Sequence, residues 1–185
     1  MDRDVEAIAR ICRHSSIGAW TTIPVPYTKL DARQFVEVAV PQSWDSGSPT
    51  WAVRESEAGE VVGMVALHGH RDGESGAEIG FWLSPTVRGR GLMTRAVNMV
   101  CDFAFAPTGM RLTRVEWRAF VGNHASAAVA ARSGFRFEGT LRGGGLQRNI
   151  RRDQWIAGRL STDSGEQASD WPRDVNPRMG VGHSA

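Results

Sequence analysis

The stretch VRGRGLMTRAV (residues 87–97) places two glycines between arginines, directly before a run of residues with helical periodicity. Gly89 and Gly91 would let the backbone approach a ligand closely. Successive backbone N–H groups at the start of a helix favour an anion, and Arg88 and Arg90 add positive charge. The spacing therefore predicts a phosphate-binding loop, with an arginine-rich solvated turn as the alternative.

Two common phosphate loops do not fit this stretch. A Walker A loop needs Gly-Lys-Ser/Thr at the helix start, where this chain has Gly91, Leu92 and Met93. A Rossmann loop needs a third glycine where Thr94 stands, and an acidic residue about 20 positions further on. The loop must therefore be interpreted together with the rest of the chain.

The elements that must position this loop alternate between strand and helix patterns. Period-two and apolar runs predict strands at 51–55, 61–70, 77–85, 112–120, 135–142 and 151–160. Helical spacing predicts helices at 4–13, from Asp31 onwards, at 91–105 and from the N-cap Asn123 to Ser133. Proline-containing loops are expected at 20–28 and 41–49. This order predicts an α+β domain built on one mixed sheet.

Two motifs in this order resemble the GNAT superfamily of acyl-CoA-dependent N-acyltransferases, within it the branch around RimJ and RimL. Arg88 and Gly91 match the loop pattern Arg/Gln-x-x-Gly-x-Gly/Ala, with Met93 in place of the last glycine, as is usual in that branch. Asn123 and Ser126 match the second motif, which continues with GF at 134–135 and EGTLR at 138–142. The resemblance covers about residues 1–160.

The resemblance implies a GNAT fold, in which a mixed, mostly antiparallel sheet is splayed around the cofactor and flanked by helices. The family begins with a strand before its first helix, whereas this chain starts directly at the helical pattern, so the first strand is expected to be missing or very short. Residues 1–160 are then one acyltransferase domain. Residues 161–185 are polar and rich in Pro and Gly, which predicts a disordered tail.

The resemblance further implies that the protein transfers an acyl group, most often acetyl, from acyl-CoA to a primary amine by direct attack in a ternary complex. The implied pantetheine-facing backbone is Phe81, Trp82 and Leu83, and the implied pyrophosphate site is Arg88, Gly89, Arg90, Gly91, Leu92, Met93 and Thr94. Asn123 and Ser126 lie on the leaving-group side, with Ser126 near the sulfur. The tyrosine that many members use to protonate the thiolate is replaced by Ala130.

Two carboxylates are candidates for the general base. Glu78 stands in AEIGF, where several family members place a catalytic glutamate, and its apolar neighbours would raise its pKa toward neutral pH. Glu116 in RVEWRAF is the second candidate on the same reasoning. A chain of water molecules without a dedicated base is the third alternative. Trp20 and Tyr27 are expected near the mouth of the acceptor pocket.

Composition limits the other classes. The formal net charge of +2 is too small to indicate nucleic-acid binding. The sequence contains no run of about 18 apolar residues, so it does not predict a membrane span. Two cysteines and the absence of a signal-peptide pattern favour a reducing cytoplasm. His68 and His70 are too few ligands for a metal site, so no metal is expected.

Several alternatives stay open at this point. The donor could be acetyl-CoA or succinyl-CoA, and the protein could be a non-catalytic acyl-CoA-binding module instead of an enzyme. The acceptor could be a protein N-terminus or a small molecule, and the chain could form a homodimer.

Overall fold

The computed structural model describes residues 2–69 and 75–176, so His70 and residues 177–185 of the expected tail lie outside the described residues. The helical elements are α1 (Asp2–Cys12), α2 (Ser15–Gly18), α3 (Lys29–Gln34), η1 (Phe35–Ala39), α4 (Val40–Asp45), η2 (Pro85–Val87), α5 (Leu92–Phe105) and α6 (His124–Arg132). The strands are β1 (Thr50–Arg54), β2 (Val61–His68), β3 (Gly76–Leu83), β4 (Arg114–Phe120), β5 (Arg136–Gln147) and β6 (Ile150–Leu160).

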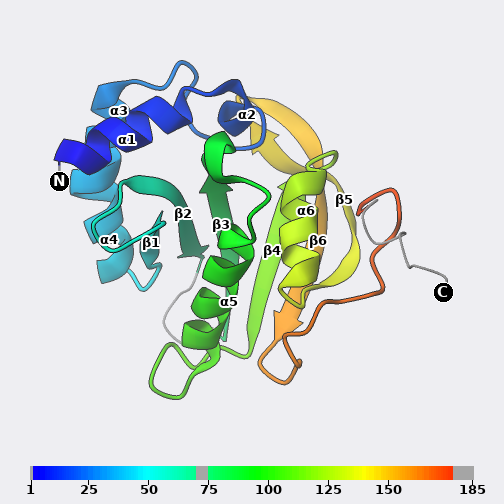
Figure 1. Ribbon diagram of the computed structural model, residues 1–185. Helices are drawn as coiled ribbons and strands as arrows, with labels where there is room; N and C mark the ends of the chain where they lie inside the picture. Colours follow the sequence, from blue (N-terminus) through cyan, green and yellow to red (C-terminus); the bar gives the residue numbers. More distant parts are fainter. Residues whose placement is uncertain (1, 70–74, 177–185) are drawn as a thin grey trace.

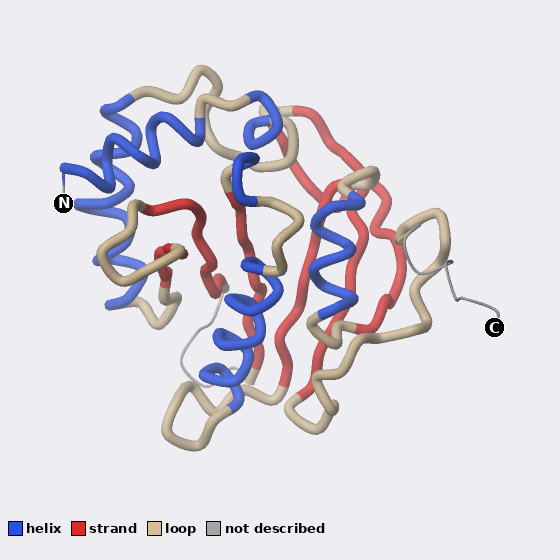
Figure 2. The backbone as a smooth tube through the Cα atoms, viewed as in Figure 1, coloured by secondary structure: helices blue, strands red, loops and turns tan. Residues whose placement is uncertain are grey.

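The six strands form one sheet in the order β1-β2-β3-β4-β6-β5 (Figures 1 and 2). All neighbouring pairs are antiparallel except β3 and β4, which are parallel because α5 carries the chain back between them. This arrangement confirms the predicted α+β class and the mixed, mostly antiparallel sheet. Within the described ranges α1 precedes every strand, as the sequence predicted.

Two hydrophobic clusters hold helices against the sheet. The larger one packs α5 and α6 on the sheet, with Val97, Ala127 and Ile79 at 0–1% exposure. The second packs α1 and α3 against β2 and β3, with Val5 and Trp82 among its members. Side chains of a strand alternate between its faces, so Ile79 and Trp82 lie on opposite sides of β3. The strand next to the glycine loop is therefore covered by helices on both faces.

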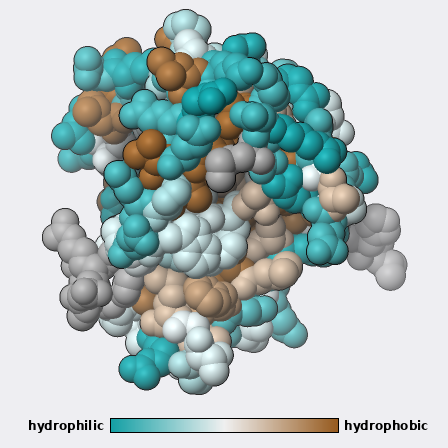
Figure 3. Space-filling model, turned by 90° about the vertical axis from the view of Figure 1, so that its left-hand side faces the viewer, coloured by the Kyte–Doolittle hydropathy of each residue, from teal (hydrophilic) through white to brown (hydrophobic). Residues whose placement is uncertain are grey.

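The side formed by the N-terminal helices presents separate hydrophobic areas between hydrophilic ones (Figure 3). The exposed apolar side chains there include Leu30 at 73%, Val38 at 44% and Trp44 at 46%. Scattered apolar residues of this kind are normal on a protein surface.

Residues 41–49 were expected to be a loop, but α4 covers the first half of this stretch. Pro41 stands in the first turn of α4, directly after the π-helical η1, where the regular i→i−4 hydrogen-bond pattern is already interrupted. The π-helical η1 joins α3 to α4, so residues 29–45 form one continuous helical stretch.

Residues 161–176 pack on the domain, which differs from the expected disordered tail. The side chain of Trp171 is only 4% exposed and its Nε1 donates to the carbonyl of Phe135 at 2.8 Å. The Val175 side chain is 2% exposed, and the Val175 carbonyl lies 2.9 Å from Nδ1 of His124. Only two apolar side chains anchor this segment, and two residues do not form a periodic hydrophobic pattern. The sequence pattern therefore could not indicate that the segment packs on the domain.

Candidate functional site

The two parallel strands at the centre of the sheet separate before they end. β3 and β4 pair only from Gly76–Arg114 to Ile79–Trp117. Beyond this point β3 continues to Leu83 while still paired with β2, and β4 continues to Phe120 while paired with β6. The last residues of β3 therefore have open backbone groups on the side that faces β4.

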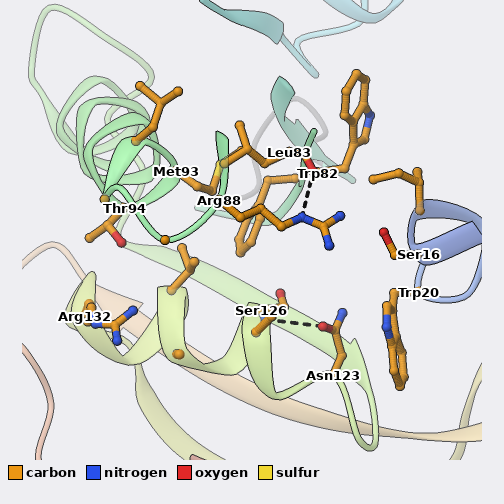
Figure 4. A pocket seen from close by; sticks show the side chains of 18 of the residues that line it. Ser16, Trp20, Trp82, Leu83, Arg88, Met93, Thr94, Asn123, Ser126 and Arg132 are labelled. Carbon is orange, nitrogen blue, oxygen red and sulfur yellow. Dashed lines mark hydrogen bonds between the residues drawn. The ribbon is translucent and has the colours of Figure 1, made fainter. Parts of the chain in front are cut away.

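A cavity of about 710 Å³ opens at this separation, lined by the glycine loop, the end of β3 and one side of α6 from its N-cap to Arg132 (Figure 4). We call it the loop cavity. Gly89 and Gly91 have φ values of 79° and 73°, in the left-handed region that glycine adopts without strain. Gly91 is the N-cap of α5, and no described side chain caps this helix. The first N–H groups of α5 are therefore free to bind an anion.

The two arginines of the loop point in different directions. Arg88 Nε donates to the carbonyl of Leu83 at 3.0 Å, and the side chain extends into the loop cavity (Figure 4). Arg90 instead forms an ion pair with Glu55 at 2.6 Å, and it is not among the residues that line the cavity. Of the two predicted cationic side chains, the structure places only that of Arg88 at the loop cavity.

The N-terminus of α6 forms the opposite wall. Asn123 Oδ1 accepts a hydrogen bond from the Ser126 N–H at 3.3 Å, as expected of an N-cap. Ser126 Oγ accepts a hydrogen bond from Nε1 of Trp117 at 3.0 Å. Since an indole N–H only donates, the hydroxyl hydrogen of Ser126 is left to point elsewhere.

A second cavity of about 400 Å³ lies on the α1 side of the separation. We call it the Glu78 cavity. It shares Trp20, Thr21, Phe81, Trp82, Asn123 and Ser126 with the loop cavity. The two cavities therefore meet where β3 and β4 part.

The structure separates the two candidate carboxylates. Glu78 lines the Glu78 cavity, and among the described residues its one ion pair is a long contact of 3.8 Å with Arg118. Burial raises the pKa of Glu78, Arg118 opposes this shift, and the neighbouring Glu116 adds to it. Glu116 does not line either cavity, and its oxygens are bound by Arg118 at 2.6 Å and Arg114 at 3.2 Å. Glu78 is the better placed of the two to accept a proton.

Most of the other predicted site residues line the loop cavity. The loop cavity is lined by the predicted residues Phe81, Trp82, Leu83, Arg88, Gly89, Gly91, Leu92, Met93, Thr94, Asn123 and Ser126. Trp20 lines both cavities, whereas Tyr27 lines only the Glu78 cavity.

Two of the groups of lining residues that sequence reasoning missed come from segments outside the motifs. Ser16 and Ile17 of α2 line the loop cavity, and Gln154 of β6 lines the Glu78 cavity. Neither group belongs to a local motif, because the contacts join segments far apart in the chain. The described residues contain no group of three or more His, Cys, Asp or Glu that could hold a metal ion. No helix in the described ranges is long and apolar enough to cross a membrane.

A mixed sheet that opens beside a glycine loop is the architecture of the GNAT class. The family model for the acetyltransferase (GNAT) domain matches residues 1–136, and the chain therefore belongs to this family.

Among curated proteins, the chain is similar to YdaF of Bacillus subtilis (strain 168), which carries the provisional name of a ribosomal N-acetyltransferase. The two are 38% identical over 86 residues, or 46% of each chain, so the chain matches about half the length of this relative.

Two solved structures show the same fold. The ribosomal-protein-S5-alanine acetyltransferase from Vibrio fischeri is 20% identical, with a TM-score of 0.74 over 87% of this chain and 90% of that one. RimJ of Mycobacterium smegmatis, solved in complex with CoA-disulfide, is 24% identical, with a TM-score of 0.71 over 86% and 78% of the two chains.

Proposed function

We propose that this protein transfers an acyl group, in the first instance acetyl, from acetyl-CoA to a primary amine. The observation that carries the proposal is the junction of the two cavities at the open edge of β3. The loop cavity offers an anion site that could bind a pyrophosphate, and the Glu78 cavity offers a carboxylate that could accept a proton. A thioester that lies along β3 would be reached by an amine from the Glu78 cavity.

The loop cavity fits the coenzyme. The open N–H and C=O groups of residues 81–83 would pair with the pantetheine amides in the manner of an added strand. The N–H groups of residues 89–94 and the guanidinium of Arg88 would bind the pyrophosphate. The complex of M. smegmatis RimJ with CoA-disulfide, a protein of the same fold, supports this assignment.

The chemical step needs a proton acceptor on one side and a proton donor on the other. Glu78, directly or through a water, takes a proton from the ammonium group, and the neutral nitrogen then attacks the thioester carbonyl. A backbone N–H of the open β3 edge stabilises the oxyanion. The C–N bond forms and the C–S bond breaks. The hydroxyl of Ser126 donates its proton to the departing sulfur and is reprotonated by the second proton that the nitrogen loses as it becomes an amide. Trp117 supports this last role because its N–H occupies an acceptor site of Ser126 Oγ.

The names of the relatives include ribosomal-protein N-acetyltransferases, which supports an amine of a protein as one class of acceptor. A small amine is the other class. Both present a primary amine to the same carboxylate, so the proposed reaction is the same for the two.

A binding and turnover experiment tests the proposal. The full chain should bind coenzyme A in calorimetry and release free thiol from acetyl-CoA when a primary amine is present. Gly91→Val should weaken coenzyme A binding more than about tenfold, because a β-branched residue does not tolerate the left-handed conformation that Gly91 adopts. Arg90→Ala is the matched control in the same loop and should leave the affinity unchanged, since this side chain contacts Glu55 outside the cavity. Coenzyme A affinity that is equal in folded Gly91→Val and wild type would contradict the assignment of the loop.

A further inference from the structure

Residues 161–176, which we call the 161–176 segment, contact α6 at both of its ends. Near the last turn of α6, the Ala168 N–H donates to the carbonyl of Ala131 at 3.0 Å. At the first turn, Nδ1 of His124 lies 2.9 Å from the carbonyl of Val175, which is a hydrogen bond when Nδ1 carries the ring proton. Because α6 has only nine residues, contacts at both ends restrict how far it can shift along its axis.

The segment approaches the end of α6 backbone to backbone. Gly134 directly follows the C-cap Ser133, and a Cβ atom on Gly134 would lie only 2.8 Å from Cα of Gly165. A Cβ atom on Gly165 would in turn collide with the guanidinium of Arg159, which donates to the Ser133 carbonyl at 3.1 Å. This close packing leaves little room for the end of α6 to move.

Trp171 joins the 161–176 segment to the side chain that binds Ser126. Its ring packs edge-to-face on Trp117, with the ring centroids 5.5 Å apart. Trp117 is 1% exposed, and its Nε1 donates to Ser126 Oγ at 3.0 Å. Trp171 itself lines neither the loop cavity nor the Glu78 cavity. Truncation of Trp171 would leave space beside Trp117, and an indole that shifts into this space would no longer hold the Ser126 hydroxyl in one direction.

The placement of Ser126 matters because the proposed reaction releases the coenzyme sulfur. α6 and its N-cap bring Ser126 and Asn123 to the wall of the loop cavity. A hydroxyl that donates a proton must lie about 3 Å from the acceptor, and a misplacement of about 1 Å can lower a rate about a hundredfold. The family model ends at residue 136, so the 161–176 segment lies outside the part of the chain that it matches.

We propose that the 161–176 segment positions the leaving-group side of the site. Trp171 holds the indole of Trp117, and the backbone contacts of the segment hold α6, so that the Ser126 hydroxyl faces the departing sulfur. Trp171 is then a positioning residue that acts through Trp117 and does not touch the substrate. This inference rests on the proposed function and concerns the same site.

The test is a double-mutant cycle between Trp171 and Ser126 in the full chain. The single-turnover rate of thiol release from acetyl-CoA is measured with a hexapeptide that has an N-terminal alanine and with 2-phenylethylamine, at a temperature at which every variant is folded. We expect Trp171→Ala to lower this rate about tenfold to a hundredfold and Trp171→Phe about threefold to tenfold, with coenzyme A affinity within about threefold of wild type. In a Ser126→Ala background, Trp171→Ala should lower the rate less than about threefold, because the group that it positions is absent.

Val53→Ala is the matched control for a loss of stability alone. Val53 is 7% exposed and belongs to the same hydrophobic cluster as Trp171, but it lies on the edge strand β1 and lines neither cavity. Its truncation should destabilise the fold and leave the single-turnover rate as in wild type.

The outcomes separate this inference from the proposed function. An equal loss of rate on Trp171→Ala in the wild-type and Ser126→Ala backgrounds would reduce Trp171 to a structural role. Wild-type rates in folded Trp171→Phe and Trp171→Ala would overturn the inference and leave the acyltransferase assignment intact. Coenzyme A binding by the wild-type chain without thiol release with any primary amine, the peptide included, would overturn the proposed function and the inference with it.

Discussion

Trp171→Ala is the substitution that most directly tests how residues 161–176 contribute to the domain. The ring lies 5.5 Å from Trp117 and 5.4 Å from Phe137, centroid to centroid, and is 4% exposed. Truncation of a buried Trp to Ala costs about 3–5 kcal/mol of unfolding free energy. For a chain of 185 residues, 1 kcal/mol corresponds to about 2–4 °C in Tm, so we expect a decrease of about 6–20 °C.

Two further variants divide this loss into its causes. Trp171→Phe keeps an aromatic ring and removes the N–H that donates to Phe135 at 2.8 Å, so it should cost about 1–3 kcal/mol. Trp44→Ala is the matched control, because Trp44 is 46% exposed and its truncation should cost clearly less. Unfolding in urea followed by circular dichroism, together with thermal melting, measures all three. A Trp171→Ala protein within about 1 kcal/mol of wild type would refute the packing of this segment.

The other predictions concern the site and its pH dependence. Glu78→Gln should lower kcat/KM about 100- to 10,000-fold at neutral pH and leave coenzyme A affinity unchanged, with part of the rate returning as the acceptor amine deprotonates between about pH 6 and pH 10. Because burial raises the pKa of Glu78, wild-type activity should decline on the acid side as this carboxylate takes up its proton, and equal activity of Glu78→Gln at every pH would make Glu78 structural. Ser126→Ala should lower kcat about a hundredfold with little change in coenzyme A affinity; unchanged single-turnover rates would remove Ser126 from the chemistry. Burial lowers the pKa of His68, so the unfolded chain takes up its proton first and stability should decrease as the pH falls below 6.5; His68→Gln should lessen this decrease in denaturation curves.

The sequence by itself determined the elements that depend on near neighbours. Gly89 and Gly91 indicated the loop because a positive φ depends on the residue type at one position, and glycine adopts it without strain. Asn123 indicated the start of α6 because a cap bonds an N–H only a few residues away. Alternating apolar residues indicated the strands, since side chains of a strand point to its two faces in turn. The motifs that led to the GNAT family consist of such local signals.

Only the tertiary structure decided features that depend on residues far apart in the chain. Glu78 and Glu116 occupy neighbouring positions on parallel strands, and the choice between them depends on which one Arg118 and Arg114 neutralise. Arg88 and Arg90 each precede a glycine of the same loop, yet Arg90 forms an ion pair with Glu55 and does not line the cavity. The Glu78 cavity exists because α1, the segment leading into η1 and the open end of β3 converge on one space. Burial and charge pairing are properties of this convergence, and no local pattern encodes them.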